Sequence, residues 1–123
     1  MEREEFEKVV EEVFESLPEK FHATIENVHI IVEEVPDTRM NARRGIRSGG
    51  ILLGLYEGIP VTRRGTEYGM YPVVPDRITL FRRNIEAVVR NDEEVRAKIR
   101  EVLIHEIGHY YGMSETEIRR AGY

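Results

Sequence analysis

The 123-residue sequence contains no cysteine, no tryptophan and no long run of apolar residues. Because cysteine is absent, neither disulfide bonds nor thiolate ligands can stabilise the chain, and any bound metal must be held by histidines and carboxylates. No apolar run reaches the roughly 18 residues that a membrane-spanning helix needs, and no apolar leader segment begins the chain. We therefore expect a cytoplasmic protein that makes no membrane contact.

The residues that are present are typical of a folded globular protein. Hydrophobic residues make up 41% of the chain and charged residues 33%, a balance that separates it from disordered sequences. A chain of 123 residues can form one domain with a modest core but not two, so we expect a single domain over residues 1–123. The net charge of −5 argues against a nucleic-acid partner.

The N-terminal segment has the apolar spacing of a helix. Its apolar residues recur at i, i+3, i+4, i+7, i+8 and i+11, which predicts an amphipathic helix packed on a core. Pro18 disfavours continuation of this helix beyond Leu17. The residues of the apolar stripe are Phe6, Val9, Val10, Val13, Phe14 and Leu17.

Three segments in the middle of the chain have the composition of strands. Residues 28–35 are mostly β-branched and apolar, residues 51–56 are apolar, and residues 77–83 alternate between two faces. Residues 61–75 contain glycines and prolines that fit a loop or a short edge strand. With helices before and after them, these segments predict an α+β fold with a small mixed sheet of about three or four strands.

Residues 38–50 are rich in arginine and glycine and lack apolar periodicity. Arg39, Arg43, Arg44 and Arg47 lie here, and we interpret the segment as a mobile, basic surface loop. Two roles are open for it: a solvated connection, or a lid or clamp for an acidic group.

The C-terminal part of the chain predicts a second helix. Asn91 fits the N-cap position, and Glu94, three residues later, can complete a capping box with it. The helix should run to about Tyr111 and stop at Gly112, because glycine readily adopts the left-handed conformation that ends helices.

This helix carries two histidines one turn apart. His105 and His109 stand at i and i+4, so both imidazoles can reach a single zinc ion, and Glu106 between them can activate a bound water. On a helical wheel Glu106 falls within the buried apolar stripe, where a carboxylate is costly unless a partner or a function compensates. The sequence therefore predicts a zinc site.

The third zinc ligand must come from outside this helix face, since catalytic sites usually take three protein ligands. Gly112 lets the backbone turn back, which would bring Glu115, six residues after His109, to the metal. Glu117 is the competing candidate, but the order from Ser114 to Glu117 also fits a capping box that would occupy Glu117. We therefore favour Glu115.

The order H-E-x-x-H-x-x-G-x-x-E over residues 105–115 resembles the extended motif of the zincin superfamily in its metzincin form. More closely, the chain resembles the small bacterial zincin-like metallopeptidases. This second resemblance is strong over residues 105–112 and 121–123, and looser over residues 52–60 and 75–83.

The resemblance implies a minimal zincin fold, in which a small sheet packs against an N-terminal helix and the helix of the motif. It also implies a Zn²⁺ ion held by His105, His109 and the acidic residue at the third position, with Glu106 as general base. Two features depart from the family pattern. Glu115 stands where aspartate or histidine is more usual, and too few residues follow it for a Met-turn.

The expected activity is hydrolysis of a peptide or protein substrate. Zinc would lower the pKa of its bound water, and Glu106 would take the proton and later pass it to the leaving amine. An extended substrate would pair with an edge strand of the sheet. The candidates for stabilising the oxyanion are Tyr110, Tyr111, Tyr123 and Arg82.

Two non-catalytic alternatives stay open. Zinc could serve only to stabilise a small domain, in which case a fourth ligand such as His22 or His29 would close the site. The chain could also be a partner-binding module that uses the basic segment from Arg39 to Arg47 as its contact surface. Nickel and copper compete with zinc for such ligands, and zinc ranks first because the ligand set suits it.

Overall fold

The structure, a computed structural model, describes residues 1–22, 28–59 and 76–122. The expected loop or edge strand at residues 61–75 lies outside this range. None of the helices that the structure describes is long and apolar enough to cross a membrane. The elements are, in chain order, α1 (Arg3–Ser16), the 3-10 helix η1 (Glu19–Phe21), β1 (Val28–Glu33), α2 (Thr38–Asn41), β2 (Arg47–Ser48), β3 (Ile51–Leu52), β4 (Gly54–Glu57), β5 (Asp76–Phe81), α3 (Arg82–Ala87), α4 (Asp92–Tyr110) and α5 (Glu115–Arg120).

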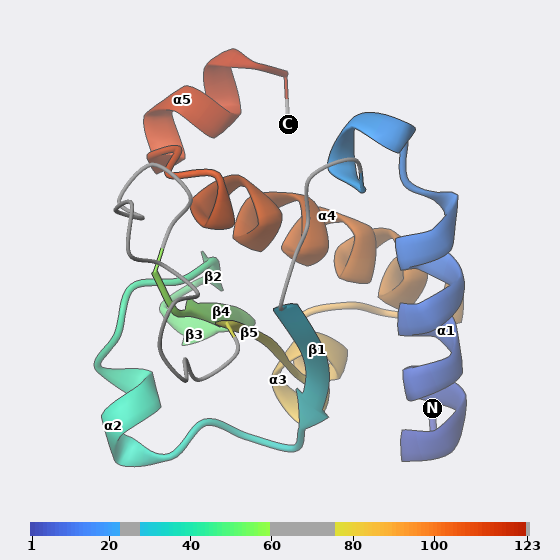
Figure 1. Ribbon diagram of the computed structural model, residues 1–123. Coiled ribbons are helices and arrows are strands. Elements are labelled where there is room, and N and C mark those ends of the chain that lie inside the picture. Colours follow the sequence, from blue (N-terminus) through green and yellow to red (C-terminus); the bar gives the residue numbers. More distant parts are fainter. Residues whose placement is uncertain (23–27, 60–75, 123) are drawn as a thin grey trace.

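A mixed three-stranded sheet forms the centre of the fold. Its order is β1-β5-β4, with β1 parallel and β4 antiparallel to β5, while β2 and β3 form a separate antiparallel pair. The helix α4 packs on β4 and β5, and α1 packs beside it (Figure 1). This arrangement confirms the predicted α+β fold, with a small mixed sheet packed against an N-terminal and a C-terminal helix.

One hydrophobic core cluster joins the sheet to the two long helices. The predicted stripe of α1 is buried in it, with Phe14 partly exposed at its margin. Burying each large apolar side chain stabilises the fold by about 1.5–3 kcal/mol, so this cluster fixes α4 against the sheet. Its members from α4 and β5 include Val95, Ile99, Val102, Leu103, Ile107, Ile78 and Leu80.

Gly54 allows α4 to approach β4 closely. A Cβ atom at this position would lie 2.4 Å from Cγ1 of Val102 and 3.7 Å from Cγ of Glu106. Any larger side chain would push the helix away from the strand. The glycine therefore holds Glu106 beside β4.

Residues 38–50 lie mostly exposed at the surface, as predicted, but they contain α2 and β2, which the prediction of a loop did not include. The side chain of Asp37 caps α2 by accepting a hydrogen bond from the Met40 N–H at 2.7 Å. Arg47 donates hydrogen bonds to three backbone carbonyls of the same segment. The segment is stabilised by these polar contacts rather than by a buried apolar face. Its sequence therefore has no apolar periodicity from which the helix and strand could be predicted.

Residues 51–56 form two strands rather than the single strand expected. The Leu53 N–H donates to the Ile46 carbonyl at 2.8 Å, and the Leu53 carbonyl accepts from the Phe81 N–H at 3.0 Å. The chain thus changes its backbone partner at Leu53, and β3 and β4 belong to different sheets. The uninterrupted apolar sequence conceals this change.

The strand expected over residues 77–83 is shorter than predicted. β5 ends at Phe81, and α3 follows without a loop. Arg82 stabilises the junction, because its guanidinium binds Glu34 at 2.7 Å and Glu86, one turn further along α3, at 3.0 Å.

Candidate functional site

The helix α4 carries three of the four predicted site residues and is fixed at both ends. At its start the Asn91 side chain accepts a hydrogen bond from the Glu94 N–H at 2.9 Å, which confirms the predicted N-cap. The Glu94 carboxylate accepts from the Arg90 N–H at 3.3 Å rather than from Asn91, so the predicted capping box is only half formed. At its end Gly112 has a φ of 81°, in the left-handed region. There the Met113 N–H donates to the Gly108 carbonyl at 2.9 Å, and the chain turns back into α5.

The short helix α5 has the capping box that the sequence predicted. The Ser114 hydroxyl accepts from the Glu117 N–H at 3.2 Å, and the Glu117 carboxylate accepts from the Ser114 N–H at 3.3 Å. Ile118 packs on Gly108 so closely that a Cβ there would lie 2.7 Å from the Ile118 Cδ1. Glu117 is therefore engaged in the cap, while Glu115 is directed back towards α4.

The carboxylate of Glu115 lies between the two histidines. Its Oε1 is 2.8 Å from Nε2 of His109, and its Oε2 is 3.2 Å from Nδ1 of His105. The other ring nitrogen of His109 is 3.0 Å from the Met113 carbonyl, which fixes the orientation of the ring. The structure thus brings together His105, His109 and Glu115, which come from two helices.

Glu115 is held in its charged form. Partial burial acts to raise the pKa of its carboxyl, but the hydrogen bond from His109 and the charges of His105 and His109 outweigh this effect. The pKa of Glu115 is therefore lowered from its usual value. A carboxylate that stays ionised is the form that binds a metal cation.

Glu106 has the opposite environment, since its side chain is 0% exposed. Its Oε2 accepts a hydrogen bond from the Ile46 N–H at 3.1 Å, while its Oε1 has no hydrogen-bond partner within the described chain. Burial raises the pKa of Glu106 to about 7, although the charge of His109 and the amides of Ile46 and Tyr56 lower it. Such a group can both accept and release a proton near neutral pH.

Comparison with known proteins identifies the family. A family model described as zincin-like metallopeptidase matches residues 25–123. The chain belongs to this family. Among solved structures, a conserved hypothetical protein from the bacterium T. thermophilus superposes with a TM-score of 0.57 and 24% identity, over 90% of this chain and 94% of that chain. At this identity the similarity supports the fold alone, and no curated protein matches significantly.

The donor set of this member of the zincin-like family fits zinc by its chemistry. Two imidazoles and one carboxylate are the ligands of many catalytic zinc sites. A ring that donates from Nδ1 of His109 to the Met113 carbonyl presents its Nε2 lone pair towards Glu115, where a cation can bind. In the described part of the chain, no group of three or more His, Asp or Glu side chains has the arrangement of a metal site. Glu115 instead hydrogen-bonds directly to both rings, and zinc would replace these contacts.

Other predicted residues of the zincin-like chain lie elsewhere. His22 is 3.0 Å from the Leu17 carbonyl and packs edge-on against Phe14, while His29 is exposed on β1. Neither makes a described contact with the pair of histidines on α4.

The residues predicted as oxyanion stabilisers have different environments in the structure. Arg82 is engaged with two carboxylates and the Met1 carbonyl, so it is not available for this role. Tyr110 is 1% exposed, and its ring packs edge-on against Tyr56 and Tyr111. Tyr123 lies outside the described residues.

Sequence reasoning missed the backbone groups that support the site. The amide of Ile46 and the carbonyl of Met113 bind Glu106 and His109, and a backbone group leaves no mark on the identity of its residue. Gly54 did carry a signal, because a glycine inside an apolar strand often marks a close backbone approach.

Proposed function

We propose that this protein is a zinc-dependent metallopeptidase in which His105, His109 and Glu115 hold the metal and Glu106 is the general base. The supporting observation is the convergence of two imidazoles and one carboxylate next to a buried carboxyl whose pKa is raised to about 7. Membership of the zincin-like metallopeptidase family supports the same reaction class.

Each residue has a distinct task in this proposal. Bound zinc would supply a Lewis acid that polarises the scissile carbonyl and lowers the pKa of water to about 7. Glu106 takes a proton from the attacking water and returns it to the leaving amine, because a pKa of about 7 suits both steps. Glu115 remains an anion and neutralises part of the metal charge.

The proposed substrate is an extended peptide that pairs with β4. This strand lies at the edge of the three-stranded sheet, and Gly54 holds Glu106 against it. Pairing along a strand edge uses the backbone of the substrate, so it gives affinity with little sequence selectivity.

The substitution Glu106→Gln tests the proposed base. It keeps the size of the side chain but removes the proton acceptor, so cleavage of a mixed fluorescence-quenched peptide library should fall by about 10²- to 10⁴-fold. Zinc content, measured by mass spectrometry, should stay at the wild-type level. Glu101→Gln, an exposed carboxyl on the same helix, is the control and should retain full turnover. Unchanged turnover in Glu106→Gln would exclude this role.

A second candidate function is favoured by the complete burial of Glu106. Glu106 is 0% exposed and is bonded to the Ile46 amide, so a substrate can reach its carboxyl only if the segment around Ile46 moves. A zinc protein without catalysis would keep the present contacts. It would gain stability from the metal and cleave no peptide of the library, whereas the peptidase would gain stability from the metal and also cleave peptides.

A further inference from the structure

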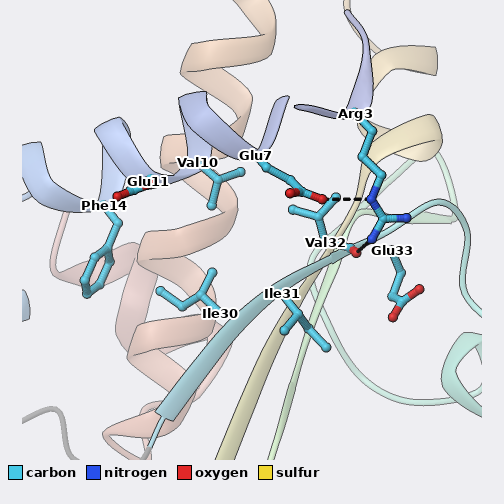
Figure 2. Close-up of a pocket in the computed structure, with 9 residues that line it drawn as sticks. All are labelled: Arg3, Glu7, Val10, Glu11, Phe14, Ile30, Ile31, Val32 and Glu33. Atoms are coloured by element: carbon cyan, nitrogen blue, oxygen red, sulfur yellow. Dashed lines mark hydrogen bonds and ion pairs between the residues drawn. The ribbon is translucent and has the colours of Figure 1, made fainter. Parts of the chain in front are cut away.

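A groove of about 540 Å³ lies between α1 and β1 (Figure 2), and its lining residues include no histidine of α4. Val10 and Phe14 of α1 form one apolar wall, and Ile30 of β1 lies opposite them. The volume of the groove is within the range of peptide and small-ligand sites. It belongs to no step of the proposed hydrolysis.

The strand β1 presents an unpaired backbone edge to this groove. It pairs with β5 on one side only, so no described strand covers its other edge. Arg3 on α1 donates to the Val32 carbonyl, so the backbone carbonyl of Val32 points to the edge of β1 that faces away from β5. Because backbone direction alternates along a strand, the N–H and C=O of Ile30 also point outward. An exposed strand edge is a template for another extended segment.

The walls of the groove carry an excess of negative charge. Three carboxylates and one guanidinium line it, and Arg3 is already paired with Glu7 at 2.8 Å. Glu11 and Glu33 are exposed and have no ion pair with any described residue. A segment along β1 would therefore place its side chains beside apolar residues and unpaired carboxylates.

We propose that this groove binds an extended polypeptide segment of alternating apolar and basic residues, which adds to the sheet as a strand along β1. Apolar side chains would pack on Ile30 and Phe14, on the face of β1 that α1 covers, and the alternating lysine or arginine side chains would lie on the opposite face, beside Glu33 (Figure 2). A second copy of this chain fits less well. Joining two β1 edges around a two-fold axis would bring the acidic α1 helices of both copies together.

The probe is a short fluorescent peptide of alternating valine and lysine. A matched peptide has glutamate in place of lysine, and a third has a central proline. Fluorescence anisotropy should show binding of the valine–lysine peptide alone, weakened by added salt. Amide exchange at Ile30, followed by NMR, should slow when this peptide binds, because its backbone would then be hydrogen-bonded. Equal binding of the glutamate peptide, or unchanged exchange at Ile30, would overturn the proposal.

Substitutions inside and outside the groove provide the matched comparison. Glu33→Lys should weaken binding of the valine–lysine peptide by about three- to tenfold. Glu5→Lys makes the same change of charge on α1, where Glu5 lines a different groove against α4, and should leave binding unchanged. Equal effects of the two substitutions would indicate non-specific attraction and contradict the groove.

The backbone pairing is tested at Ile30. Ile30→Pro removes the outward N–H without breaking the β1–β5 pairing and should abolish binding, whereas Ile30→Val should retain it. If thermal melting shows that Ile30→Pro does not fold, the comparison of Glu33→Lys with Glu5→Lys and the amide exchange of Ile30 still test the proposal. Binding that is lost in Glu115→Ala but kept in the groove variants would place the peptide at the histidines. Dimerisation of the peptide-free protein that protects Ile30 would assign the edge to a second copy. Either result would overturn the proposal.

Discussion

Glu106 and Glu115 have the same carboxyl group, but their surroundings favour opposite protonation states. For Glu106 burial dominates and raises the pKa to about 7. For Glu115 the two histidines outweigh burial and lower the pKa. In the proposed mechanism this difference assigns metal binding to Glu115 and proton transfer to Glu106, and two carboxyl groups with divergent pKa values are a common feature of hydrolytic sites.

The same shifts predict how the stability of the metal-free protein depends on pH. The folded state holds the Glu106 proton more tightly than the unfolded chain, so the Glu106 contribution to the unfolding free energy decreases from pH 4.5 to about 7. The decrease should be about 3 kcal/mol, an order-of-magnitude value. Glu115 acts in the opposite sense, and its stabilising contribution is lost only as the pH falls below 4.5.

Chemical denaturation in the presence of a chelator can isolate the Glu106 contribution. Between about pH 5 and pH 7, wild type should lose stability relative to Glu106→Gln, because glutamine does not titrate. Parallel stability curves for the two proteins over this range would contradict the raised pKa. Measurements below pH 4.5 would mainly report on Glu115.

At the scale of elements, α5 acts as the support for Glu115. Its capping box fixes the first turn, and Ile118 fixes its distance from Gly108 on α4. The helix is only six residues long, so its position depends on these contacts rather than on intrinsic helix stability. Metal affinity should therefore depend on the N-cap of α5 even though Ser114 is not a ligand.

The substitution Ser114→Ala tests this support. Loss of the cap should cost about 1 kcal/mol of stability, and zinc affinity should fall about tenfold or more, as for other residues that orient ligands. Asn91→Ala removes the cap at the far end of α4 and is the control. It should cost similar stability, measured by denaturant unfolding, while zinc affinity in a competition titration stays unchanged. Equal zinc affinities in the two variants would show that the cap does not position Glu115.

At the scale of the whole molecule, much of the architecture could be predicted because it depends on side-chain periodicity and caps. The stripe of α1 and the caps at Asn91 and Ser114 gave correct helices, and the apolar segments gave the strands of a mixed sheet. The motif on α4 also predicted the family. The placement of His105, Glu106 and His109 close together could be predicted because it depends only on the geometry of one helix.

The remaining features depend on backbone contacts between distant segments. The division of residues 51–56 at Leu53 follows from a change of hydrogen-bond partner, which apolar periodicity cannot reveal. The shielding of Glu106 depends on the Ile46 amide, 60 residues away in the sequence. The groove beside β1 likewise arises only when α1 is placed next to the edge of the sheet.

The measurement that tests the central claim most directly is the zinc content of the untagged protein, by mass spectrometry, in wild type, Glu115→Gln and Glu117→Gln. Glutamine at position 117 can maintain the capping box, so the two variants differ mainly in which carboxylate is lost. We predict about one zinc per chain in wild type and Glu117→Gln and much less in Glu115→Gln. No zinc in reconstituted wild type, or equal zinc in both variants, would contradict the proposed metal centre.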